Sequence, residues 1–108
     1  VGSARALGLA MLGEKLPAET AERWGMIWKC VDDDALDAEV DALAARLARM
    51  PTAAIAAVKR AIRHAATADL DAQLDLERDL QAHLGASHDY AEGVNAFLEK
   101  RAPRFEGR

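Results

Sequence analysis

A chain of 108 residues suffices for one domain with a modest core, and its 51% hydrophobic and 30% charged residues exclude a disordered tail. The formal charge of −4 argues against a nucleic-acid partner, and no apolar run approaches the roughly 20 residues of a membrane helix. Cys30 is the single cysteine, so an internal disulfide is excluded, and we expect a reducing, cytoplasmic location. Abundant alanine and only 5% aromatic residues favour packed helices over sheet.

The first part of the chain predicts two helices and one ambiguous run. A helix over residues 3–12 ends at Gly13, and a short helix begins at Pro17 and ends at Gly25. Residues 26–31 are an apolar run with strand character, but the sequence offers no partner strand. The run must therefore pair elsewhere, form a loop, or be helical.

Four further helices are predicted from apolar stripes that lie between N-cap residues and glycine or proline. They are a helix capped by Asp34, a helix capped by Thr52, a helix over residues 70–84 closed by Gly85, and a helix from Ser87 through Leu98 closed by Pro103. The fold class is thus mainly α, with five to six helices.

The apolar stripes are narrow and rich in alanine. In the helix over residues 70–84, the predicted inward stripe is Leu70, Leu74, Leu80 and Leu84, with Leu76 off the stripe. Such helices approach one another closely but bury little area per residue, so we expect additional burial from partner subunits.

Histidines and acidic residues offer little that predicts a catalytic or metal site. His83, His88 and Asp89 suggest a metal pair, but zinc needs three or four ligands, so we expect the histidines at helix ends and no metal. His64 is expected at the surface. The pairs Glu77 with Asp79 and Asp71 with Asp75 are expected to be solvated helix charges, not acid–base pairs.

Other candidates also have simpler explanations. Cys30 lies in an apolar run and is expected to be a buried, inert thiol. Residues 32–34 are three aspartates, which lack calcium-loop spacing and serve as a turn and a cap. We find no phosphate loop and no nucleophile elbow, so no catalytic residue is assigned.

Two basic groups remain. One helix carries Lys59, Arg60 and Arg63, and Lys100 follows the aromatic Phe97 by three residues, with Arg101 and Arg104 beyond it. An aromatic ring one turn from a lysine presents a stacking face beside a phosphate-binding charge. That combination suits a nucleotide-like ligand, although a core phenylalanine beside a surface lysine is the simpler interpretation.

The chain resembles the late part of the crotonase (enoyl-CoA hydratase/isomerase) superfamily along its whole length. Within the superfamily, residues 24–28 and 73–81 are most similar to one branch. The enzymes of that branch isomerise the ring 1,2-epoxide of phenylacetyl-CoA. The runners-up are an enoyl-CoA hydratase and a Δ3,Δ2-enoyl-CoA isomerase. The similar segments are residues 4–8, 12–16, 17–22, 24–27, 50–52, 58–61 and 89–105 (DYAEGVNAFLEKRAPRF).

The resemblance implies a C-terminal helical segment of an α/β crotonase fold. Residues 1–31 would end the catalytic-core domain, and residues 32–108 would form a helical oligomerisation domain of a homotrimer or hexamer. Together with the absence of an initiating methionine and of a signal-like stretch, this predicts a fragment that is inactive alone.

The resemblance also implies where the chemistry lies. Two backbone N–H groups polarise the thioester carbonyl and a carboxylate moves protons, and both belong to the family's N-terminal core. Phe97 and Lys100 match an aromatic and a lysine that contact the adenine and phosphates of coenzyme A, the substrate's carrier; no other cofactor is implied. Tyr90, on the same helix, is a candidate for approaching the acyl pocket. The alternative of another class is a non-catalytic helical interaction module.

Overall fold

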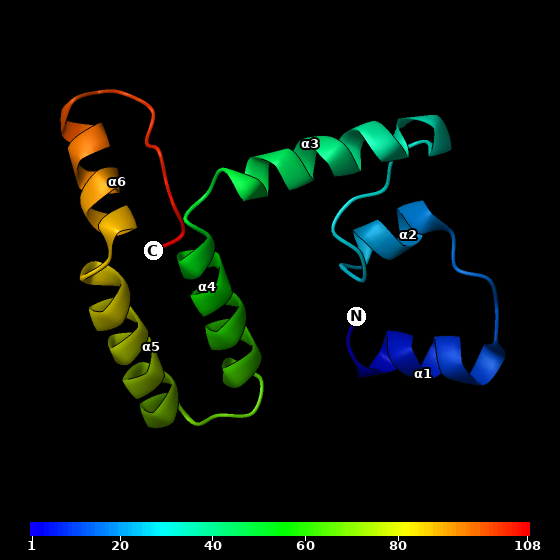
Figure 1. The fold of residues 1–108 in the computed structure, drawn as a ribbon. Helices are drawn as coiled ribbons and strands as arrows, with labels where there is room; N and C mark the ends of the chain where they lie inside the picture. Colours follow the sequence, from blue (N-terminus) through cyan, green and yellow to red (C-terminus); the bar gives the residue numbers. More distant parts are fainter. The chain divides into compact units, whose positions relative to one another are not determined.

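The computed structural model describes all 108 residues and contains six α-helices, one short 3-10 helix and no strand (Figure 1). The predicted mainly α class and the helix number are confirmed. No helix combines the length and the hydropathy that crossing a bilayer demands. The elements are α1 (Ser3–Leu12), α2 (Ala18–Arg23), η1 (Asp33–Ala35), α3 (Leu36–Ala48), α4 (Thr52–Ala65), α5 (Leu70–Gly85) and α6 (His88–Leu98).

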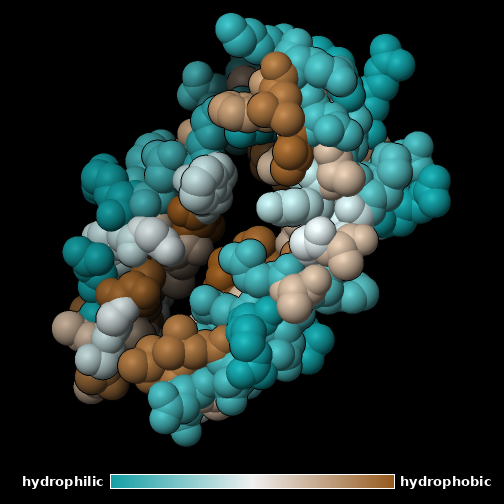
Figure 2. Space-filling model, turned by 90° about the vertical axis from the view of Figure 1, so that its left-hand side faces the viewer, coloured by the Kyte–Doolittle hydropathy of each residue, from teal (hydrophilic) through white to brown (hydrophobic).

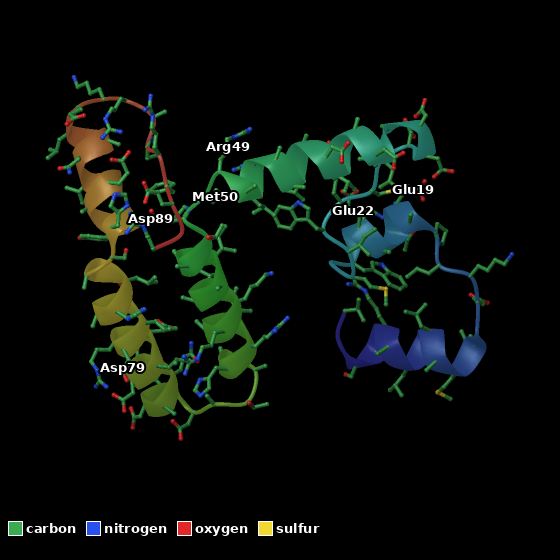
Figure 3. The ribbon with its side chains drawn as sticks, in the orientation of Figure 1. Glu19, Glu22, Arg49, Met50, Asp79 and Asp89 are labelled. Carbon is green, nitrogen blue, oxygen red and sulfur yellow. The ribbon has the colours of Figure 1, made fainter.

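The contacts of the chain divide it into two compact units, Val1–Val40 and Asp41–Arg108. In the first unit α1 ends at Gly13, whose left-handed backbone (φ 65°) caps the helix as predicted. Of the three alternatives left open for residues 26–31, the structure shows the loop: the run is irregular and forms no strand. Its backbone is tied locally, since the N–H of Cys30 donates to Glu22 Oε1 at 3.1 Å (Figure 3).

Two predicted N-caps are wrong by a few residues. Asp34 lies inside η1, because a 3-10 turn that begins after Asp32 runs directly into α3. Pro51, not Thr52, is the N-cap of α4, since its carbonyl accepts the first helical bond, from Ile55 at 3.1 Å. A cap is set by which carbonyl first accepts, and a favourable side chain nearby does not decide it.

In the second unit α5 packs against both α4 and α6. The leucine stripe predicted for α5 is partly wrong: Leu70 and Leu74 are 72% and 54% exposed, whereas Leu76 is half-buried. The covered face of α5 carries Leu76, Leu80 and Leu84, and Gln73 on this face donates to the carbonyl of Ala61 on α4 at 3.3 Å. The predicted stripe and the covered face lie next to each other on the helix and share Leu80 and Leu84. The position of α4 therefore decides which of the two is covered.

The core is thin, as the alanine-rich stripes predict. Ala21 and Ala96 are the only buried hydrophobic residues, and many large apolar side chains are exposed. Figure 2 shows apolar side chains reaching the surface in several places on one face of the molecule. Isolated helices with such stripes gain little from burial, and most helical stability in proteins comes from packed apolar faces.

Candidate functional site

An apolar groove lies along α6, and we call it the α6 groove. Its volume is about 420 Å³, within the range of roughly 300–1,000 Å³ typical of small-molecule sites. Residues from the start of α4, the end of α5, the face of α6 and the C-terminal segment line it, among them Pro51, Leu84, Tyr90, Gly93, Phe97 and Phe105. The groove therefore brings together residues that are distant in the sequence.

The end of α6 is closed by a lysine in an unusual conformation. The N–H of Lys100 donates to the carbonyl of Phe97 at 3.2 Å, and the N–H of Arg101 donates to that of Ala96 at 3.0 Å. This is a Schellman motif, in which glycine is the usual residue at the left-handed position. Here that residue is Lys100 (φ 56°), the only non-glycine residue with positive φ, at a cost of about 1–2 kcal/mol. The helix thus ends before Pro103, which was expected to close it.

Glu92 on α6 binds the C-terminal segment, residues 101–108. Its Oε1 and Oε2 accept from the two terminal guanidinium nitrogens of Arg101, Nη1 and Nη2, at 2.6 and 2.9 Å, and Oε1 also accepts the N–H of Arg104 at 2.7 Å. The hydrogen bonds from Arg101 and then from the Arg104 backbone lower the pKa of Glu92 to about 2. In return the carboxylates of Glu92 and Glu99 raise the pKa of Arg101. Such bidentate, charge-assisted pairs are among the stronger polar contacts in proteins.

Asp89, at the start of α6, binds the end of the same segment. Its carboxylate is buried and accepts the backbone N–H groups of Glu106 at 2.7 Å and Gly107 at 2.8 Å, while its own N–H donates to the carbonyl of Arg108 (Figure 3). Burial acts to raise the pKa of Asp89, but the two backbone hydrogen bonds together with the neighbouring His88 outweigh it, so the pKa lies below its usual value. Phe105 lies against Gly93, where an added Cβ would be 3.6 Å from the ring.

The predicted ligand residues Phe97 and Lys100 lie at the C-terminal end of α6. Phe97 is 83% exposed and borders the α6 groove, and Lys100 is exposed and forms no ion pair. Tyr90 also lines the groove and is 60% exposed. An exposed ring and an unpaired ammonium group are therefore close in the chain and accessible, and a coenzyme A contact at this pair stays a prediction.

Other candidates are brought into no common site. His88 Nδ1 lies 3.5 Å from Asp89 Oδ1, and no three His, Cys, Asp or Glu side chains gather in metal-binding geometry. Cys30 is half-buried; burial first, and the charges of Glu19 and Glu22 next, raise its pKa, which disfavours the reactive thiolate.

The charged helix faces are solvated, as predicted. Asp79 and Asp75 pair with Arg78 at 2.8 and 2.7 Å, and Glu77 accepts from Gln73, all in exposed positions. His64 is exposed, with Nδ1 2.9 Å from Gln73 Oε1. The basic residues of α4 are exposed as well: Lys59, Arg60 and Arg63.

The acidic residues that hold the C-terminal segment were missed by sequence reasoning. Asp89 and Glu92 lie on one face of a helix, and a run of basic and small residues follows it, which is a weak signal of a segment folding back. The spacing of nine residues between Glu92 and Arg101 does not predict their contact, because α6 ends between them and helical periodicity no longer applies.

Acidification is expected to release the C-terminal segment from Glu92. The folded-state pKa of about 2 lies below the ordinary glutamate pKa of 4.5, so the stabilisation is present above about pH 4.5 and is lost as the pH falls toward 2. The protection of the Arg104 amide against hydrogen exchange, followed by NMR, should fall in that window. The amide of Ile55, which donates to the carbonyl of Pro51, is the control. Protection of Arg104 that follows Ile55 at every pH would contradict the expectation.

Comparisons with known proteins agree on one family. The family model described as enoyl-CoA hydratase/isomerase matches residues 1–108. The chain is 54% identical over 107 residues to the 1,2-epoxyphenylacetyl-CoA isomerase of Escherichia coli, covering 99% of this chain and 41% of that protein. It is 53% identical over 108 residues to a Rhodobacter capsulatus protein assigned as an enoyl-CoA hydratase, covering 100% of this chain and 42% of that one.

The solved structures give the same picture. A Mycobacterium abscessus protein assigned to the enoyl-CoA hydratase/isomerases superposes with a TM-score of 0.96 at 40% identity, covering 100% of this chain and 42% of that one. The chain thus spans about two fifths of the length of the relatives that it matches.

Proposed function

The chain belongs to the enoyl-CoA hydratase/isomerase family, and from this membership we propose that it is the C-terminal segment of an acyl-CoA isomerase acting on the ring 1,2-epoxide of phenylacetyl-CoA. The observation that carries the proposal is the 54% identity to the Escherichia coli isomerase, which extends over nearly every residue. The 53% identity to the Rhodobacter capsulatus protein supports an enoyl-CoA hydratase as the second candidate.

We assign the segment to binding and assembly, not to the bond-breaking step. By the family resemblance, the groups that polarise the thioester carbonyl and move protons would belong to the family's N-terminal core and not to this segment. The CoA thioester enters as substrate, with no further cofactor. Residues 1–31 would complete the catalytic-core domain and residues 32–108 the oligomerisation domain of a homotrimer or hexamer.

Phe97 and Lys100 are the proposed coenzyme A contacts. The exposed ring of Phe97 suits stacking on adenine, and an ammonium group suits phosphate. The C-terminal end of a helix carries partial negative charge, so a phosphate there needs a cation beside it. Arg101 is already paired with Glu92 and Glu99, whereas Lys100 pairs with no carboxylate. Its charge is therefore available for the ligand.

The exposed apolar side chains support the assembly role. Val58 and Ile62 on α4 and Leu70 and Leu74 on α5 are more than half exposed. Each of these pairs is spaced by four residues, so its two side chains are neighbours on the helix surface, and adjoining exposed apolar side chains are typical of protein–protein interfaces. Burial against other chains would supply the stabilisation that the thin core lacks.

A full-length hybrid tests the proposal. These 108 residues replace the matching segment of the Escherichia coli isomerase, and the hybrid is compared with the unmodified enzyme. We expect the hybrid to have the same oligomeric mass by light scattering as the parent and an isomerase turnover within about ten-fold of it. The segment is proposed to supply assembly and coenzyme A contacts, and 54% of its residues are identical in the parent enzyme.

The possible failures have distinct meanings. A hybrid that assembles but hydrates an enoyl-CoA without isomerising the epoxide would favour the second candidate. A hybrid that cannot assemble, or that assembles and binds no acyl-CoA, would overturn the proposed role of the segment.

A further inference from the structure

Lys100 occupies a backbone position that disfavours its residue type. Glycine adopts the left-handed conformation without steric cost, whereas Lys100 holds φ 56° with a full side chain. Residues in such conformations persist only where their surroundings determine them strongly, and they gather at functional sites. The contacts that hold Lys100 in this conformation therefore point to residues that matter for its function.

The chain is restrained on both sides of Lys100. Before it, the hydrogen bond from its own N–H to the carbonyl of Phe97 joins it to α6. Immediately after it, the Arg101 guanidinium is held by both carboxylate oxygens of Glu92, whose side chain is only 14% exposed, and by Glu99 Oε2 at 2.6 Å. A bidentate pair fixes orientation as well as distance.

Anchoring the C-terminal segment does not by itself require this pair. Asp89 already binds the far end of the segment through the backbone of Glu106, Gly107 and Arg108. Glu92 acts at the other end, on the residue directly after Lys100 and on the N–H of Arg104. The two carboxylates thus hold different parts of the segment, and only Glu92 acts beside Lys100.

We propose that Glu92 and Arg101 are positioning residues, whose ion pair holds the Lys100 backbone in its left-handed conformation and thereby places the ammonium group for a coenzyme A phosphate. This inference rests on the proposed function of Lys100. Neither Glu92 nor Arg101 needs to touch the ligand, because both of their charges are used within the pair.

The test uses steady-state kinetics of the full-length hybrid with an acyl-CoA substrate. Glu92→Gln keeps the shape but weakens the pair, and Arg101→Lys keeps the charge but cannot bind both oxygens. Each is expected to raise KM about three- to ten-fold and to leave kcat within about two-fold. The lost contact binds the substrate and the transition state equally, so its removal weakens binding without slowing the chemical step. Asp75→Asn, which breaks the exposed pair with Arg78 on α5, is the matched control and should change neither constant.

A double-mutant cycle separates positioning from general support of the fold. With Lys100→Ala already present, Glu92→Gln should raise KM no further, because the group that it positions is gone. Additive effects on KM would overturn the positioning role, as would a Glu92→Gln enzyme with unchanged KM while Lys100→Ala raises it. If Lys100→Ala itself leaves KM unchanged, the proposed coenzyme A contact fails instead. The oligomeric mass of each variant shows whether it is assembled, and an Arg101→Lys enzyme that is assembled with unchanged KM would also overturn the inference.

Discussion

Lys100→Gly is expected to make the hybrid enzyme more stable and, at the same time, a weaker binder of its acyl-CoA substrate. Glycine relieves the left-handed strain at φ 56°, and after its larger unfolded-state entropy is subtracted, the gain in unfolding free energy is about 0.5–1 kcal/mol. Loss of the ammonium group removes a charge-assisted contact to phosphate and should raise KM about ten-fold. Urea unfolding and steady-state kinetics of the same preparations measure the two effects.

Lys100→Ala is the matched control, because it also removes the ammonium group but keeps a Cβ at the strained position. It should raise KM as much as Lys100→Gly does, without the gain in stability. Phe97→Ala should raise KM as well, with little change in stability, since the ring is 83% exposed. Equal KM values in wild type and Lys100→Gly would remove Lys100 from the ligand site. Equal stabilities of the glycine and alanine variants would show that the strain at this position is no larger than the entropic cost of glycine.

Asp89→Ala is expected to free the end of the C-terminal segment. The buried carboxylate accepts two backbone N–H groups, from Glu106 and Gly107, and alanine leaves both without a partner. Gly107 also packs so closely against Thr52 of α4 that a Cβ there would collide with the Thr52 Oγ1. Release of the segment's end therefore also loses this packing contact. Trypsin should then cleave the Arg104–Phe105 bond about ten- to a hundred-fold faster, because the open state is more populated.

Asp89→Asn provides a graded comparison, since one amide oxygen can still accept one of the two N–H groups. Its cleavage rate should fall between those of wild type and Asp89→Ala. A segment that is cleaved equally fast in all three proteins would show that Asp89 does not hold it. Cleavage after Arg49, in the exposed connection between α3 and α4, serves as the internal reference for protease activity at a site that Asp89 does not hold.

Local patterns in the sequence were sufficient to predict the helices. The helix over residues 3–12 and its glycine end were confirmed, as was Ser87, whose Oγ accepts the N–H of Tyr90 at 3.1 Å. Such features depend on residues within one helical turn, so they can be inferred without knowledge of the fold. Sequence patterns did not decide the structure where they were compatible with two local solutions. Residues 26–31 have the composition of a strand but no partner, and they form the loop that was one of the alternatives. α5 has two leucine faces, and packing covers one of them.

The candidate site depended on contacts that no local pattern encodes. The ring of Phe97 and the charge of Lys100 were evident from their spacing, and the family resemblance suggested their ligand. The left-handed backbone of Lys100 and the partners of Glu92 and Asp89 became visible only in the folded chain. These carboxylates meet groups nine to eighteen residues away, because the segment after α6 turns back along the helix. Propensity and periodicity act over a few residues, whereas such a return path is selected by packing of the half-buried Phe105 against Gly93 and by the hydrogen bonds that Asp89 and Glu92 accept from the returning segment.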